Sequence, residues 1–382
     1  MWPLIIVASV VGLAITVYMA LRLAPMQVLG LYDRALRNHR DRLERPHELP
    51  VYAEADLAAT WPGWDGWYVL LVPQGPAVPA KAIRVSIMTG LYGLDGIDHY
   101  AKLQGLSPFE AVEYLMMIQT DSTSRLFRRY LPKQTDLAIR RDQLLVVVKD
   151  WGEIGGEWPQ YRIQMQAPEA DMALSLTYTG KHLLWWADFP HVFTYVAAFG
   201  ELQGTLTLDG QDYAVTGLGS FEHGFARKPF NFDALLRPLR VLQRLWPVTL
   251  MHYHYNLLIG DDGVHGGMML AQGLGIDFRN LGGIYFPDGR FIRLTEIQVD
   301  YLEIETPQDQ PQSSAIAMPK KWLVRATAET GSVEYTATRL SPPAVIATHM
   351  VYGDFQFVGR YRAPGSDDVV VSGHGYNEFV RI

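Results

Sequence analysis

The sequence predicts a mainly β protein, with two β domains in tandem behind an N-terminal membrane-spanning helix. The first observation is an apolar, charge-free segment at residues 2–21. The second is a series of short alternating segments separated by turn residues from Gln143 to the C-terminus, which is typical of sandwiches and barrels. The third is that strands and helices do not alternate and that no P-loop or nucleotide-binding glycine motif occurs. A chain of 382 residues has room for two or three domains.

Composition excludes several classes of function. The formal net charge of −7 argues against a nucleic-acid-binding protein, which needs a basic surface. The chain has no cysteine, so disulfides, a thiolate nucleophile and a cysteine-based zinc site are excluded. No cofactor is expected from any motif.

We interpret residues 1–25 as a transmembrane anchor. Residues 2–21 are long enough to cross a bilayer as a helix. No Lys or Arg precedes them and no small-residue cleavage site follows, which favours a retained anchor over a signal peptide. Several arginines follow the anchor, from Arg22 to Arg45. The positive-inside rule therefore predicts a single-pass protein of the inner (plasma) membrane with cytoplasmic C-terminal domains.

Residues 26–50 are predicted to form an amphipathic, basic juxtamembrane helix. Val28, Leu31, Leu36 and Leu43 fall on one helical face, with arginines around the rest. Such a helix either lies on anionic lipid headgroups or packs against the following domain. The sequence leaves both interpretations open.

The first β domain is expected at residues 51–230, with a short helical insertion near residues 107–131. Ser107 is placed as an N-cap, Pro108 at the first helical position and Glu110 three residues past the cap. This pattern predicts a helix to about Gln119, with a second piece over residues 124–130.

The remaining segments predict strands and hairpins. Residues 144–148 form an apolar run, residues 161–165 and 172–178 alternate, and an Asp209-Gly210 pair marks a tight turn. A basic, leucine-containing linker is expected at residues 231–247, and an interfacial element at the membrane is its alternative interpretation. The second β domain is expected at residues 248–382, with turns at residues 261–263 and 287–289.

Glu222 and His223 are the best candidates for chemistry. An acid beside an imidazole supplies a proton donor and a group that can orient or charge it. A buried structural pair is the alternative. His252 and His254 would share one strand face, as two metal ligands do, but histidines that line a core or cavity are favoured, and no metal is expected.

Three segments, in order, resemble one known family. They are the stretch GTLTLDGQDYAVTGLGSFEHGF, the stretch HYHYNLLIGDDGVHGGMMLAQ and the closing VVVSGHGYNEFVRI. Together they are similar to the carotenoid hydratase (hydroxyneurosporene synthase) and AttH-like lipocalin superfamily, over roughly residues 161–382. The resemblance implies two tandem lipocalin-like β-barrels. The first 150 or so residues match poorly, and the anchor is not part of the family pattern.

The resemblance also implies a site between the barrels. Glu222 and His223 fall on the family's acid-His pair, whose acid protonates a C=C bond of an acyclic isoprenoid before water captures the cation. Phe225, His252, His254 and Tyr255 would line the substrate cavity. The chain departs from the pattern because Glu222 replaces an Asp, Phe225 a Trp and Ala226 a Gly.

Two functions follow as alternatives. The first is a membrane-anchored hydro-lyase acting on a hydrophobic isoprenoid such as a carotenoid. The second is a non-catalytic pigment- or lipid-binding subunit, docked to other subunits of an integral membrane complex such as a photosynthetic complex. The retained acid-His pair favours the first, and the altered motif favours the second.

Overall fold

The computed structural model describes residues 64–75, 78–92, 101–107, 110–140, 144–189, 193–226, 230–231, 252–273, 276–305, 318–328, 330–347, 350–363 and 368–381. The predicted anchor, the juxtamembrane helix and nearly all of the linker lie outside these ranges. Within them, no helix has the length and apolar character needed to cross a membrane.

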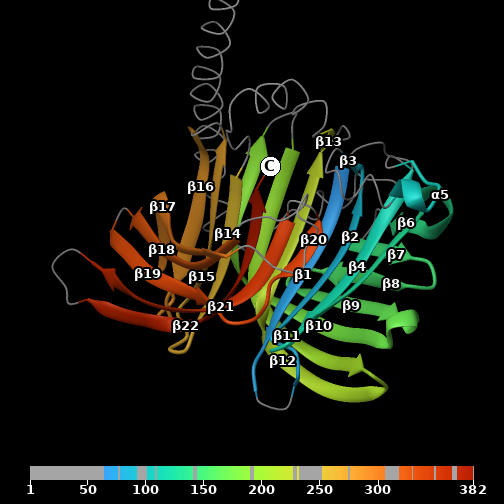
Figure 1. The fold of residues 1–382 in the computed structure, drawn as a ribbon, viewed down its shortest axis with the longest axis horizontal. Helices are drawn as coiled ribbons and strands as arrows, with labels where there is room; N and C mark the ends of the chain where they lie inside the picture. The colour runs from blue at the N-terminus through green and yellow to red at the C-terminus, as the bar shows by residue number, and fades with distance from the viewer. Residues whose placement is uncertain are drawn as a thin grey trace, which may run out of the picture.

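The first sheet contains eleven strands and curls into a near-closed barrel, coloured blue to yellow-green in Figure 1. Its hydrogen-bonded order is β5-β4-β2-β1-β12-β11-β10-β9-β8-β7-β6, and the edge strands β5 and β6 are joined by the single helical turn α5 (Lys133–Asp136). Its strands are β1 (Trp64–Pro73), β2 (Ala82–Thr89), β4 (Ala111–Gln119), β5 (Ser124–Pro132), β6 (Leu137–Arg140), β7 (Leu144–Val148), β8 (Gly152–Glu157), β9 (Gln160–Ala167), β10 (Met172–Phe189), β11 (Phe193–Leu208) and β12 (Gln211–Ala226). A short 3-10 turn (Pro168–Ala170) joins β9 to β10, and β3 (Leu91–Tyr92) pairs with β13 (Phe230–Asn231) outside the main sheet.

The second sheet forms the orange-to-red barrel beside the first (Figure 1). It has nine strands in the order β19-β18-β17-β16-β15-β14-β22-β21-β20, and an additional pairing of β19 with β21 closes the ring and leaves β20 at the side. Its strands are β14 (His252–Gly260), β15 (His265–Gly273), β16 (Ile276–Tyr285), β17 (Phe291–Glu305), β18 (Met318–Ala328), β19 (Gly331–Arg339), β20 (Ala344–Ala347), β21 (Met350–Arg362) and β22 (Val369–Arg381). The prediction of a mainly β chain with two barrels is therefore confirmed.

The β11–β12 hairpin shows why the sequence reading of the strands succeeded. Asp209 and Gly210 have φ values of 54° and 72°, the left-handed conformations that a two-residue hairpin turn requires. The turn sets the register that pairs Leu208 with Gln211 and continues to Thr194 and Phe225. The position of Glu222 in the sheet follows from this register.

The helical insertion predicted near residues 107–131 is wrong. The backbone amide of Glu110 bonds to the carbonyl of Ser107, which makes one turn, and β4 and β5 follow it. Every residue of β4 is buried. Val112 and Tyr114 fill the first barrel, whereas Leu115 faces the second barrel. Because both faces are covered, the strand lacks the polar alternation that distinguishes a half-buried strand from a helix.

The two barrels pack against each other through a buried cluster that we call the barrel junction. Tyr285 of the second barrel donates a hydrogen bond to the Leu183 carbonyl of the first, and the Phe199 and His265 rings stack 3.9 Å apart. The junction combines Leu70, Val72, Ala82, Leu115, Met117, Leu184, Ala197 and Phe199 with Tyr255, Leu257, Ile259, Met269, Tyr285, Ala344, Tyr352 and Tyr376.

Candidate functional site at the barrel junction

Glu222 lies on β12, on the face of the first barrel that is turned toward the second. Its side chain is buried, with 7% of the residue exposed. The Ser220 hydroxyl, two residues earlier on the same face, donates to Oε1 at 2.8 Å, and the Tyr195 hydroxyl donates to Oε2. The carboxyl group is therefore held in a fixed orientation by two hydroxyl groups.

Burial raises the pKa of Glu222 above its usual value. The hydrogen bond from Tyr195, the charge of Arg84 and the hydrogen bond from Ser220 oppose this shift, and the charge of Glu378 adds to it. Desolvation dominates because a charged carboxylate loses most of its hydration in an apolar junction. A carboxyl group with a raised pKa keeps its proton at higher pH and can donate it.

Arg84 and Glu378 form an ion pair across the junction beside Glu222. Arg84 Nη1 of the first barrel lies 2.8 Å from Glu378 Oε2 of the second, and their side chains are 12% and 13% exposed. The guanidinium carbon lies 4.0 Å from the centre of the Tyr352 ring and 5.4 Å from that of Tyr68. The junction thus holds a cation between aromatic rings, in the geometry of a cation–π contact.

Tyrosine side chains dominate the surroundings of these charged groups. Tyr255 and Tyr352 flank Glu378 on the two neighbouring strands, and Tyr68 lies opposite Glu222 in the β1–β12 pair. Burial raises the pKa values of Tyr255 and Tyr352 well above the ordinary value, so both remain neutral hydroxyls. Their rings give the junction an apolar wall with polar ends.

His223 faces away from Glu222, into the first barrel. Neighbouring residues of a strand point to opposite faces, so the pair cannot act as one unit in this sheet. The His223 Nε2 atom lies 2.8 Å from Asp65 Oδ1, and the imidazole stacks on Trp67 with ring centres 5.0 Å apart. The expected orientation of Glu222 by His223 is therefore wrong; hydroxyl groups orient the acid instead.

His252 and His254 face the interior of the second barrel. Both contact the Tyr301 hydroxyl, His252 through Nε2 at 2.5 Å and His254 through Nδ1 at 3.2 Å. The rings of His254 and Trp322 lie 5.3 Å apart. Four residues were expected to line the substrate cavity, and of these Tyr255 lies next to Glu222. His252 and His254 do not. Phe225 is located by its backbone, which lies opposite Asp65 in the strand pairing.

No group of three or more His, Asp or Glu side chains that could hold a metal ion occurs in the part of the chain that the structure describes. The Tyr301 hydroxyl is a contact that His252 and His254 share.

His254 provides a test of the second barrel's interior. Burial and the charge of neighbouring His252 lower its pKa from 6.5 to about 3, against a smaller opposing hydrogen bond from Asn256. Between pH 6.5 and pH about 3, the unfolded chain binds more protons at this histidine than the folded chain, so the stability of the fold decreases as the pH is lowered. One such group contributes up to about 1.4 kcal/mol per pH unit. In urea unfolding followed from neutral pH to pH about 4, we expect His254→Gln to lose less stability than the native chain; equal losses would contradict this assignment.

Sequence reasoning missed the role of Arg84. It is the one charged residue of β2, whose sequence is AIRVSIMT, and it interrupts a run that is otherwise largely apolar. A charge in a strand that is otherwise buried needs a partner, and this was the available signal. Its partner Glu378 is 294 residues away, in the closing segment of the chain, so no local pattern connects the two.

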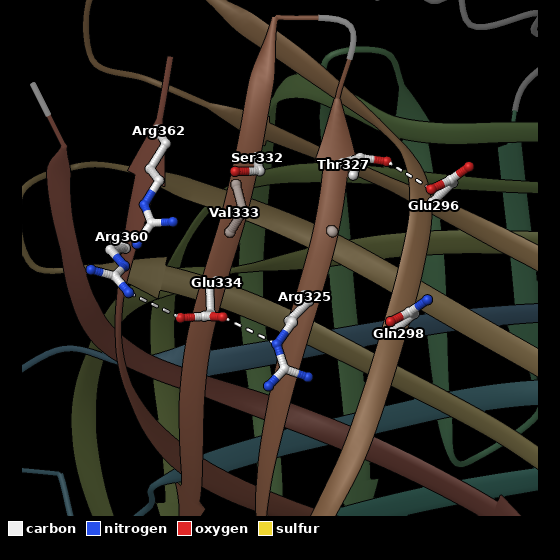
Figure 2. A pocket seen from close by; sticks show the side chains of 10 residues that line it. Glu296, Gln298, Arg325, Thr327, Ser332, Val333, Glu334, Arg360 and Arg362 are labelled. Atoms are coloured by element: carbon white, nitrogen blue, oxygen red, sulfur yellow. Dashed lines mark hydrogen bonds and ion pairs between the residues drawn. The ribbon is translucent and has the colours of Figure 1, made fainter. Parts of the chain in front are cut away.

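Two hollows of the described chain lie in the second barrel, away from Glu222. One, of about 260 Å³, is on its outer face, where Arg325, Arg360 and Arg362 point outward from neighbouring strands (Figure 2). Arg325 and Arg360 both pair with Glu334, so the charges of this surface largely neutralise one another. The other is a small apolar gap in the interior beside Tyr335 and Phe357. Neither is lined by Glu222, Arg84 or Glu378.

Comparisons with known proteins agree with this architecture. Residues 107–255 match the model of DUF6670, a family of unknown function. No curated protein is significantly similar in sequence. A putative AttH from Nitrosomonas europaea has a TM-score of 0.58 at 14% identity, over 87% of this chain and 96% of that one. Kievitone hydratase from Nectria haematococca has a TM-score of 0.53 at 10% identity, over 87% of this chain and 94% of that one. The chain therefore has the double-barrel fold of these two proteins.

Proposed function

We propose that this chain is a membrane-anchored double-barrel hydro-lyase that adds water to a C=C bond of a hydrophobic isoprenoid such as a carotenoid. The observation that carries the proposal is Glu222, a buried carboxyl group with a raised pKa at the barrel junction. The hydratase among the structurally similar proteins supports the same class of reaction.

The chemistry needs an acid, a sheltered cation and water. Glu222 would transfer its proton to one alkene carbon, and the cation would form on the other. The electron-rich faces of aromatic rings at the junction would stabilise a cation at short range. Exclusion of bulk water until the cation forms would favour transfer from Glu222 over loss of the proton to solvent.

The test is mass spectrometry of lipids from cells that make acyclic carotenoids. The native chain should give a product heavier by one water, and the Glu222→Gln variant should not. Equal amounts of product from both chains would remove Glu222 from the mechanism. If neither chain gave a hydrated product, the proposed hydration of carotenoids would be contradicted.

A membrane location would bring the junction close to a lipid-dissolved substrate. We propose residues 1–25 as the anchor, with both barrels on the cytoplasmic side of the inner (plasma) membrane. Deleting these residues should move most of the protein from the membrane pellet to the supernatant on cell fractionation. A truncated chain that remained with the membrane would locate its attachment elsewhere, with the predicted basic segment at residues 26–50 as the next one to remove.

The second candidate is a non-catalytic subunit of a membrane complex. Two observations favour it: large buried side chains pack the junction, and apolar Val358 and Val370 are 62% and 67% exposed on neighbouring strands of the second barrel. Exposed apolar side chains on adjacent strands suit a contact with another protein. This candidate predicts no hydrated product, together with co-purification of the chain with an integral membrane complex that the Val358→Lys variant fails to join.

A further inference from the structure

A second carboxyl group, Glu378, enters the barrel junction from the opposite barrel. It lies on β22, between Tyr255 of β14 and Tyr352 of β21 in the strand pairing. Arg84 Nη1 lies 2.8 Å from its Oε2 atom. Because the arginine comes from the first barrel, packing of the two barrels completes this ion pair.

Glu222 and Glu378 are linked through shared neighbours. Tyr68 lies opposite Glu222 in the strand pairing, and its ring contacts the guanidinium group that binds Glu378. Tyr255 lies directly opposite Glu378 on the neighbouring strand β14. Its side chain also interacts with Glu222 and Ser220. The charges of Arg84 and Glu378 both act on Glu222, in opposite directions. The two acids therefore belong to one electrostatic unit.

Their surroundings differ in the way that separates an acid from a base. Glu222 is buried, with 7% of the residue exposed, and the loss of hydration favours its neutral form against the hydrogen bonds that the Tyr195 and Ser220 hydroxyls donate to it. Glu378 is bound to a guanidinium group, which stabilises a carboxylate. Two carboxyl groups whose environments favour opposite charge states are the usual arrangement for paired acid and base catalysis.

We propose that Glu378 is the general base that activates water in the hydration assigned to this junction, with Arg84 as the residue that positions it. This inference rests on the proposed function. The Glu222 O–H bond breaks as the alkene π electrons form a C–H bond, which leaves a cation on the neighbouring carbon. A water oxygen then forms the C–O bond and gives one proton to the Glu378 carboxylate. Return of that proton to Glu222 restores both groups, and the net change is alkene plus water to alcohol.

The chain offers a matched control for the test. Glu113 forms another buried ion pair with an arginine, Arg128 Nε, at 2.9 Å, with side chains 5% and 9% exposed. Both its members belong to the first barrel, on β4 and β5. Glu113→Gln therefore repeats the chemical change of Glu378→Gln in a buried pair whose two members come from one barrel.

The experiment measures hydration of an acyclic carotenoid in detergent micelles by the full chain, as a function of pH. Glu378→Gln keeps the shape of the side chain and an oxygen for Arg84. We expect it to lower kcat at least about 100-fold with little change in KM, and to remove the decline of the rate at acidic pH. Glu113→Gln should keep the native rate and pH profile. If the Glu378→Gln enzyme kept the native kcat and the native decline of the rate at acidic pH, Glu378 would not be the general base. Glu222 would still be the proposed acid.

A second measurement separates this inference from the proposed function. In full-length protein labelled with carboxyl-¹³C glutamate, NMR at neutral pH should show one protonated carboxyl signal that Glu222→Gln removes. It should also show an ionised signal that Glu378→Gln removes and that Arg84→Gln shifts toward the protonated form. An inactive native chain would contradict the proposed hydratase function and the base step with it. If both acids had the same protonation state, the division of acid and base roles between them would be contradicted for any substrate.

Discussion

Replacing Glu222 by glutamine is expected to lower the rate of hydration at least about 100-fold while the protein stays folded. General acids contribute factors of roughly 100 to 10,000 to enzymatic rates. Glutamine keeps the shape of the side chain and an oxygen that can accept from Ser220 or Tyr195, so the junction retains its packing. What disappears is the transferable proton. The measurement is the yield of hydrated product per folded protein, with folding checked by circular dichroism.

The structure predicts an asymmetry between Glu222 and its sequence neighbour. If the adjacent pair acted as a unit, glutamine at position 223 would cost as much activity as glutamine at position 222. Because His223 binds Asp65 inside the first barrel, we expect His223→Gln to act mainly on stability, with a much smaller loss of rate per folded molecule. Equal rate losses in the two variants would restore the pair as a catalytic unit.

The largest effect on stability is expected from Arg84→Met. Removing one member of a buried ion pair leaves the other charge desolvated and costs about 3–5 kcal/mol, whereas replacing both members by apolar residues is often neutral. Arg84→Met strands Glu378 in the junction and also removes the guanidinium group from Tyr352. The double variant Arg84→Met/Glu378→Leu should recover most of the lost stability. Urea denaturation of the full chain in detergent, followed by tryptophan fluorescence, measures both effects.

The control for this cycle is an exposed ion pair. Arg129 and Glu169 are paired on the first barrel with side chains 35% and 52% exposed. Solvent-exposed pairs contribute about 0–1 kcal/mol, so Arg129→Met should change the unfolding midpoint little. If Arg84→Met were equally mild, or if the double variant were as unstable as the single one, the cross-barrel pair would not be what holds the junction together.

The sequence predicted most of the strands because half-buried strands follow simple rules. The buried pattern of β9 alternates at every residue, and the Asp209-Gly210 turn has the backbone conformation that its residue types require. The prediction failed at β4, where two covered faces remove the alternation and a local Ser-Pro-Phe-Glu signal extends to one turn. It also failed at β5, whose two buried residues, Phe127 and Tyr130, lie three apart rather than two. Local signals identify an element when solvent covers one of its faces, and they weaken when a second barrel covers both.

By itself the sequence determined the mainly β composition of this protein, its hairpin turns and the candidate acid Glu222. These depend on local backbone preference and on the two-residue period of a strand. That same period already implied that Glu222 and His223 face opposite sides of the sheet. The tertiary structure alone decided which groups surround the acid. Arg84 and Glu378 are 294 residues apart, and their ion pair exists because two separate barrels pack against each other, which no local pattern in either strand encodes.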